Sequence, residues 1–171
     1  MTCMPHRAIL LNGPSSSGKS TLARALRLAL RSVRRAACDI VSIDDHLKMT
    51  IVDVIEEDDV YAVSPLICAA AKNALAAGHV VIMDHVITSE RIFRQTMDAL
   101  EGVDVLLVHV TCSREELVRR ETARKNRCPG SAEASHDYLY PQSGYDLTVD
   151  TTNHPPEEIA EQILAALLHL Q

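Results

Sequence analysis

Residues 13–20 read Gly13-Pro14-Ser15-Ser16-Ser17-Gly18-Lys19-Ser20, which fits the pattern G-x-x-x-x-G-K-[ST]. The stretch follows a short apolar run, 8–11, and precedes a segment, 22–33, in which apolar residues recur near helical spacing. Glycine at both ends permits the backbone angles with which consecutive amides surround an anion. Placed between a strand and a helix, the stretch predicts a loop that binds phosphate at a helix N-terminus, rather than a turn that only caps the helix.

Short apolar runs alternate with longer helical patterns along the rest of the chain. The runs rich in Val, Ile and Leu are 8–11, 39–43, 80–83, 103–110 and 147–149, and the helical patterns are 22–33, 64–77, 90–100, 113–127 and 156–170. This alternation predicts an α/β fold, a three-layer sandwich around a five-stranded parallel sheet, with ligands at the carboxyl ends of the strands. The 171 residues fit one domain, 1–171.

The phosphate-binding loop suggests how a nucleotide and a metal ion would be held. We expect Lys19 to carry positive charge toward the β- and γ-phosphates of ATP, and Ser20 to offer its hydroxyl to Mg²⁺. Asp84 follows the apolar run 80–83, where an acidic residue positions Mg²⁺ in enzymes with such loops, so we expect Ser20 and Asp84 at the metal. The expected nucleotide-binding residues are Gly13, Ser15, Ser16, Ser17, Gly18, Lys19, Ser20, Thr21 and Arg120.

Composition and charge argue against several classes of partner. The chain has 17 Lys and Arg against 23 Asp and Glu, and its net charge of −6 disfavours nucleic acid. The run 8–11 is too short for a signal-peptide core or a membrane span, so we expect no membrane association. The 5 cysteines form no C-x-x-C pair, which favours the reducing cytoplasm over a disulfide framework. Nothing in the composition opposes a homodimer.

Two neighbouring acids are candidates for the general base of phosphoryl transfer. Asp44 and Asp45 follow the second apolar run, so at least one carboxylate should lie at the carboxyl edge of the sheet. We expect Asp44 to activate the acceptor and Asp45 to cap a short helix, 46–49.

Three arginines are candidates for charges that stabilise the transferring phosphate. Arg120, Arg124 and Arg127 are spaced by four and three residues, which places them on one face of a helix. A solvated helix in which glutamates pair with these arginines is the alternative. The polar segment that follows, 128–142, has the composition of a mobile lid, so we expect an arginine-bearing lid over about 120–143. The expected catalytic residues are Lys19, Asp44, Arg124 and Arg127.

Three further stretches resemble a known family in the same order along nearly the whole chain. They are Val41-Ser42-Ile43-Asp44, Arg120-Glu121-Thr122-Ala123-Arg124 with Arg127, and Tyr145-Asp146 leading to Val149-Asp150-Thr151-Thr152. Together with the loop they resemble the chloramphenicol phosphotransferase family. The resemblance implies phosphorylation of an antibiotic hydroxyl with ATP and Mg²⁺, and hence a role in antibiotic resistance. It also implies strand order 2-3-1-4-5, Asp44 as the base, Lys19 on the γ-phosphate, and Arg124 and Arg127 as lid charges.

The chain departs from that family where the acceptor should bind. Residues 56–59 are all acidic, and the whole chain holds only 4 Tyr and 1 Phe. An acidic rim without an aromatic wall favours a polar or cationic alcohol, for example an aminocyclitol such as hygromycin, over chloramphenicol. A solvated acidic loop is the alternative. A nucleoside or metabolite kinase of the same fold and a non-catalytic nucleotide switch remain as other functions, although no N-K-x-D guanine motif is present.

Overall fold

The sheet of this protein is parallel throughout and carries the expected strand order. A computed structural model describes residues 7–48, 55–124 and 129–169. The strands are β1 (Arg7–Asn12), β2 (Cys38–Ser42), β3 (Val80–His85), β4 (Asp104–Thr111) and β5 (Leu147–Asp150). They form a 5-stranded sheet in the order β2-β3-β1-β4-β5, which confirms the predicted α/β sandwich.

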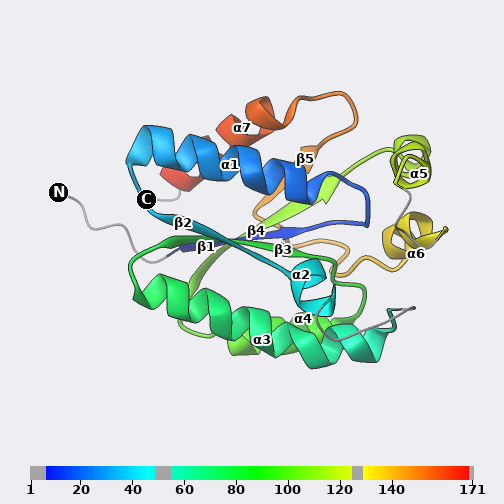
Figure 1. The fold of residues 1–171 in the computed structure, drawn as a ribbon, viewed down its shortest axis with the longest axis horizontal. Coiled ribbons are helices and arrows are strands. Elements are labelled where there is room, and N and C mark those ends of the chain that lie inside the picture. The colour runs from blue at the N-terminus through cyan, green and yellow to red at the C-terminus, as the bar shows by residue number, and fades with distance from the viewer. Residues whose placement is uncertain (1–6, 49–54, 125–128, 170–171) are drawn as a thin grey trace.

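Helices cover both faces of the sheet (Figure 1). One face carries α1 (Lys19–Arg34) and α7 (Pro156–His169), and the other carries α2 (Ile43–Lys48), α3 (Glu57–Ala76) and α4 (Glu90–Ala99). Two further helices, α5 (Arg114–Thr122) and α6 (Ser131–Asp137), lie beyond the carboxyl edge of the sheet. Every helix of the described chain is too short or too polar to cross a bilayer.

Alternate residues of each central strand supply the two hydrophobic cores. Ile9 and Leu11 of β1 pack with α1 and α7, whereas Ala8 and Leu10 pack with α3 and α4, and all four side chains are fully buried. Because both faces are covered, the strands appear in the sequence as continuous apolar runs without a polar alternation. These cores fix the carboxyl edge at which the loops after the strands converge.

Several helix boundaries differ from the prediction, for local reasons. Helix α3 begins at Glu57 and not at Ser64, because the Glu56 amide donates to the Asp59 carboxylate over 2.8 Å and acids fill the first turn. The predicted acidic loop is therefore largely the start of α3. Helix α5 was predicted to reach residue 127, but it ends at Thr122. Just beyond this end, the Arg124 amide donates back to the Glu121 carbonyl.

The segment predicted to be a mobile lid contains a helix. Helix α6 begins after Gly130, whose φ of 86° lies in the left-handed region that glycine tolerates. Its Ala132 and Ser135 side chains are buried, so one side of this short helix packs against the protein. The polar composition of 128–142 concealed that contact.

Candidate active site

The loop between β1 and α1 has the geometry of a phosphate cradle. A Cβ at position 13 would collide with the Val110 carbonyl oxygen, so only glycine fits there. Gly18 has φ 90° and Ser16 has φ 64°, both in the left-handed region, and these angles turn the loop back toward α1. Gly13 and Gly18 are therefore required by close packing and by backbone conformation, respectively.

Three hydroxyls of this loop are buried without a hydrogen-bond partner among the described residues. They belong to Ser15, Ser16 and Ser17. An unsatisfied buried hydroxyl costs about 1–3 kcal/mol, so a partner rich in acceptor oxygens would stabilise the loop. The phosphates of a nucleotide supply such acceptors, and the α1 N-terminus adds its positive dipole end.

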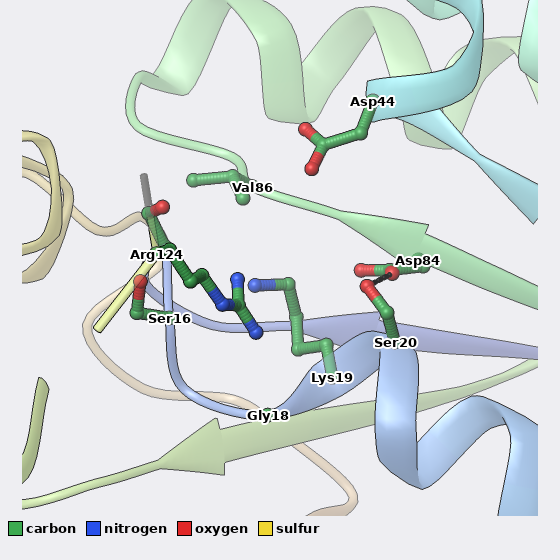
Figure 2. A pocket seen from close by; sticks show the side chains of 9 residues that line it. Ser16, Gly18, Lys19, Ser20, Asp44, Asp84, Val86 and Arg124 are labelled. Atoms are coloured by element: carbon green, nitrogen blue, oxygen red, sulfur yellow. Dashed lines mark hydrogen bonds between the residues drawn. The ribbon is translucent and has the colours of Figure 1, made fainter. Parts of the chain in front are cut away.

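Lys19, Ser20 and Asp84 meet at the first turn of α1 (Figure 2). The Lys19 ammonium donates to the Pro14 carbonyl over 2.8 Å, which holds this side chain across the loop. The Ser20 hydroxyl donates to Asp84 Oδ2 over 2.6 Å, and Asp84 is only 4% exposed. One hydroxyl beside one carboxylate fits Mg²⁺, which takes the rest of its octahedral shell from phosphates and water.

Asp44 and Arg124 enclose the space above the loop from two other directions. Asp44 lies in the first turn of α2, one residue after the helix begins, and its carboxylate points into the pocket (Figure 2). The Arg124 side chain extends into the same space from just beyond α5. The space left between these side chains has a volume of about 20 Å³.

Asp45 does not have the capping role that we expected. Helix α2 begins at Ile43, so Asp45 lies inside the first turn, and its carboxylate is 3.6 Å from the Lys48 ammonium. The Asp45 side chain is 76% exposed and lines none of the pockets described here. Of the two acids, Asp44 is the one that faces the phosphate loop.

Arg120 borders a second pocket, which shares Gly18 and Arg124 with the first. Its guanidinium donates to Glu116 over 2.7 Å and to the Thr151 carbonyl over 2.7 Å, and these bonds fix its plane. Hydrogen bonds from Arg119 and Arg120 lower the pKa of Glu116 to about 2, so this carboxylate is charged at neutral pH. The pocket measures about 150 Å³ and is lined by Gly18, Thr21, Leu22, Arg120, Arg124, Thr151, His154, Pro156 and Ile159.

Thr151 connects this pocket to the phosphate loop, a role that we did not predict. Its hydroxyl donates to the Ser17 carbonyl over 2.6 Å and accepts from Arg120 over 3.1 Å. The Val149-Asp150-Thr151-Thr152 stretch contributed to the family resemblance, but nothing in the sequence placed Thr151 beside Ser17.

Glu121 and Ser135 dock α6 onto the rest of the site. The Glu121 carboxylate, 7% exposed, accepts from the Gly130 amide, the Ser131 hydroxyl and the Ala132 amide over 2.6–2.9 Å. Burial raises the pKa of Glu121, but these hydrogen bonds outweigh burial and lower it. The Ser15 amide donates to the Ser135 hydroxyl over 2.8 Å, which joins α6 to the phosphate loop. A glutamate in an arginine-rich helix gave no sign of this role.

A larger cavity opens between α2, the start of α3 and α6. It measures about 510 Å³ and is lined by Ser15, Ile43, Asp44, Leu47, Ile55, Glu56, Glu57, Val60, Val86, Thr88, Ser131, Ala134, Ser135 and Tyr138. Ser15, Asp44 and Val86 also line the small pocket above the phosphate loop. The two spaces therefore meet at Asp44.

The structure brings together most of the predicted site residues. All predicted residues from Gly13 to Thr21 lie on the loop or the first turn of α1, with Asp44, Asp84, Arg120 and Arg124 around them. Arg120 and Arg124 do not share a helix face, because α5 ends between them. Arg127 lies outside the described residues.

Comparisons with known proteins match nearly the whole chain. The family described as chloramphenicol phosphotransferase-like protein matches residues 6–168. Two Mycobacterium tuberculosis proteins, from strains CDC 1551 and H37Rv, are named as O-phosphotransferases on a provisional basis. Each is 30% identical to this chain over 187 aligned positions, which cover 95% of this chain and 83% of the relative.

Solved structures of other proteins share the fold. An APS kinase of Mycobacterium tuberculosis, in complex with AMPPNP and APS, superposes with a TM-score of 0.78 at 16% identity over 96% of this chain and 99% of that chain. A gluconokinase of Sinorhizobium meliloti has a TM-score of 0.69 at 21% identity over 96% and 93% of the two chains. A tunicamycin resistance protein of Deinococcus radiodurans has a TM-score of 0.67 at 19% identity over 93% and 94%.

Proposed function

Because the chain belongs to the chloramphenicol phosphotransferase-like family, and is therefore a phosphotransferase, we propose that it transfers the γ-phosphate of ATP to a small-molecule hydroxyl. The observation that carries this proposal is the position of Asp44. Its carboxylate lines both the small pocket above the phosphate loop and the 510 Å³ cavity. A hydroxyl that enters from the cavity thus reaches a general base and the end of a triphosphate together.

The nucleotide is assigned to the loop and the pocket beside Arg120. The three serine hydroxyls that lack a partner among the described residues would hold the phosphates together with the loop amides, and Arg120, which lines the 150 Å³ pocket, would contact a nucleobase there. Gly18 and Thr21 line that pocket, so a nucleobase bound there would lie next to phosphates bound in the loop. The AMPPNP complex of the similar APS kinase supports ATP as the donor.

In the proposed reaction the acceptor oxygen attacks the γ-phosphorus while the bond from that phosphorus to the β–γ bridging oxygen breaks. Asp44 accepts the hydroxyl proton, and ADP leaves. Lys19 and Arg124 approach the same space and would neutralise charge that spreads over the transferring oxygens. Mg²⁺ held at Ser20 and Asp84 would supply Lewis-acid stabilisation of the phosphate oxygens.

The acceptor is proposed to be an antibiotic-like alcohol, either chloramphenicol-like or an aminocyclitol such as hygromycin. The family description and the tunicamycin resistance protein of the same fold support an antibiotic. A metabolite kinase is the second candidate, because the similar folds also include an APS kinase and a gluconokinase.

Paired carboxamide variants test the role of Asp44. Asp44→Asn should lower kcat for acceptor-dependent ADP release by ~10² to 10⁴, as is typical when a general base is removed. Asp45→Asn is the matched control, because this neighbouring acid is 76% exposed, and it should cost little. Chloramphenicol and hygromycin B serve as acceptors, and AMPPNP binding should be the same in both variants. An equal loss in the two, or a larger loss in Asp45→Asn, would show that Asp44 is not the base.

A further inference from the structure

We propose that Asn12 is a positioning residue for phosphoryl transfer, because its side chain holds two walls of the site at a fixed place relative to the phosphate loop. This inference rests on the proposed function, since it concerns the alignment of an acceptor at Asp44 with a phosphate in the loop. Asn12 is the last residue of β1 and directly precedes Gly13, where the loop begins. The residue is fully buried, so its polar side chain needs partners inside the protein.

The side-chain amide of Asn12 makes three hydrogen bonds, each 2.9 Å long. Its Oδ1 accepts from the Ile87 amide, and its Nδ2 donates to the Tyr140 carbonyl and to the Tyr145 hydroxyl. Both hydrogens on Nδ2 are therefore used. The reverse orientation would turn Nδ2 toward the Ile87 N–H and Oδ1 toward the Tyr140 carbonyl, so only one orientation of this amide fits.

A further hydrogen bond closes a ring around Asn12. The Tyr140 amide donates to the Ile87 carbonyl over 2.9 Å, so Asn12, Ile87 and Tyr140 each bond to the other two. Ile87 follows β3 and Tyr140 follows α6. The ring thus joins the start of the phosphate loop to two segments that are far apart in the sequence.

Tyr145, the third partner of Asn12, is itself held on the sheet. Its ring stacks on His109 of β4, with 4.6 Å between the ring centres. The neighbouring Asp146 amide donates to the Leu107 carbonyl of β4, and the Asp146 carboxylate accepts from the Leu107 amide, each over 2.8–2.9 Å. Asn12 therefore has a rigid acceptor on this side.

The two segments in the ring carry walls of the site. Val86 and Thr88, on either side of Ile87, line the 510 Å³ cavity, and Val86 also lines the small pocket above the phosphate loop (Figure 2). Tyr138, two residues before Tyr140, lines the cavity as well. Displacements of about 1 Å can cost ~10²-fold in rate, so loss of the ring should disturb the alignment of an acceptor.

The phosphate loop has its own supports, which do not involve the Asn12 side chain. The Ser17 amide donates to the Pro14 carbonyl over 3.2 Å, and the Lys19 ammonium donates to the same carbonyl over 2.8 Å. The Thr151 hydroxyl donates to the Ser17 carbonyl over 2.6 Å. Loss of the Asn12 amide should therefore affect the acceptor far more than the nucleotide.

A comparison of acceptor kinetics with nucleotide affinity tests the inference. In Asn12→Ala the acceptor KM should rise and kcat should fall, each by ~10-fold or more, while the Kd of AMPPNP stays within ~3-fold of the wild-type value. Chloramphenicol and hygromycin B serve as acceptors. Unchanged acceptor KM and kcat would overturn the inference, as would a loss of AMPPNP affinity as large as the rise in KM.

Ile163→Ala is the control for lost stability. Ile163 is a fully buried residue of α7 in the core between α1, α7 and the sheet, and it lines none of the pockets described above. This substitution should lower the unfolding temperature, as Asn12→Ala does, and leave acceptor KM and kcat unchanged. An equal kinetic effect of the two substitutions would show that Asn12 acts through stability alone.

Two conservative variants separate the hydrogen bonds of Asn12 from its size. Asn12→Asp keeps the shape but places an oxygen against the Tyr140 carbonyl, so its kinetic defect should match that of Asn12→Ala. Tyr145→Phe removes one acceptor and keeps the ring, so the acceptor KM should rise by a smaller factor, about 3-fold. Wild-type kinetics in either variant would contradict the inference, and Tyr145→Phe provides the test if the Asn12 variants do not fold.

The wild-type protein distinguishes failure of the inference from failure of the proposed function. Turnover by the wild type with unchanged kinetics in Asn12→Ala leaves the phosphotransferase proposal standing and overturns the inference. If the wild type phosphorylates neither acceptor, the proposed function fails, and hydrogen exchange at the Ile87 and Tyr140 amides decides whether Asn12 holds the two walls. Exchange there should accelerate at least ~10-fold in Asn12→Ala and not in Ile163→Ala, and equal exchange in both variants would overturn the inference.

Discussion

His85 is a fully buried titratable residue directly beside Asp84. Its Nε2 lies 3.1 Å from the Ser64 hydroxyl, which itself donates to the Val60 carbonyl, so the Nε2–H of His85 donates to the Ser64 oxygen. Burial lowers the pKa of His85 to about 4, so the ring is neutral at pH 7. The ring is closed off from the acceptor, and its contribution is to stability.

Acidification should therefore destabilise the protein through His85. In the unfolded chain the pKa of His85 is about 6.5, so between pH 6.5 and about pH 4 the unfolded state binds more protons than the folded state does. The stability contributed by the neutral ring is complete above about pH 6.5, and on the order of 3 kcal/mol is lost as the pH falls to about 4. Urea unfolding of the wild type and His85→Gln across this window should show a shallower pH dependence in the variant. Protonation of the folded-state ring near its ordinary pKa in an NMR titration would refute this account.

At the scale of secondary-structure elements, the docking of α6 depends on Glu121. This buried carboxylate accepts hydrogen bonds from two amides and one hydroxyl at the start of α6. In turn, the Ser135 hydroxyl of α6 accepts a hydrogen bond from the Ser15 amide of the phosphate loop. Glu121→Gln removes the charge and turns an amide group toward donors, at a cost of about 1–3 kcal/mol. Hydrogen exchange at the amides of 131–137 should accelerate roughly 10-fold or more. Glu133→Gln, an exposed change on the same helix, is the control, and equal exchange in both variants would show that Glu121 does not hold α6.

The sequence predicted elements well where apolar periodicity is strong and poorly where tertiary contacts decide. All five strands were found within a residue or two at each end, because both faces of the sheet are buried. Helix α6 was missed, since its stability depends on Glu121, which lies before it in the chain and gives no periodic signal. The start of α3 was missed because its capping acids also fit a solvated loop.

At the scale of the whole molecule, the parallel topology gathers distant segments at one edge. Five parts of the chain meet there: the loop after β1, Asp84 of β3, Asp44 of α2, Arg120 of α5 and Thr151 after β5. The strand order and the motif spacing together predicted this meeting for all of them except Thr151, whose contact with Ser17 only the structure shows. The acceptor cavity could not be predicted in the same way, because it brings Ile55 and Tyr138 together with Asp44, and this depends on side-chain packing.

The central claim is that this site moves a phosphate from ATP to an alcohol, and transfer of a labelled phosphate tests it most directly. Protein, γ-labelled ATP and Mg²⁺ are incubated with chloramphenicol or hygromycin B, and the products are separated. We expect the label in a phosphate monoester of an alcohol, with a loss of at least ~10²-fold in Lys19→Ala, because the reaction depends on charge and position. Label confined to ATP and inorganic phosphate, or transfer by Lys19→Ala at the wild-type rate, would contradict the claim.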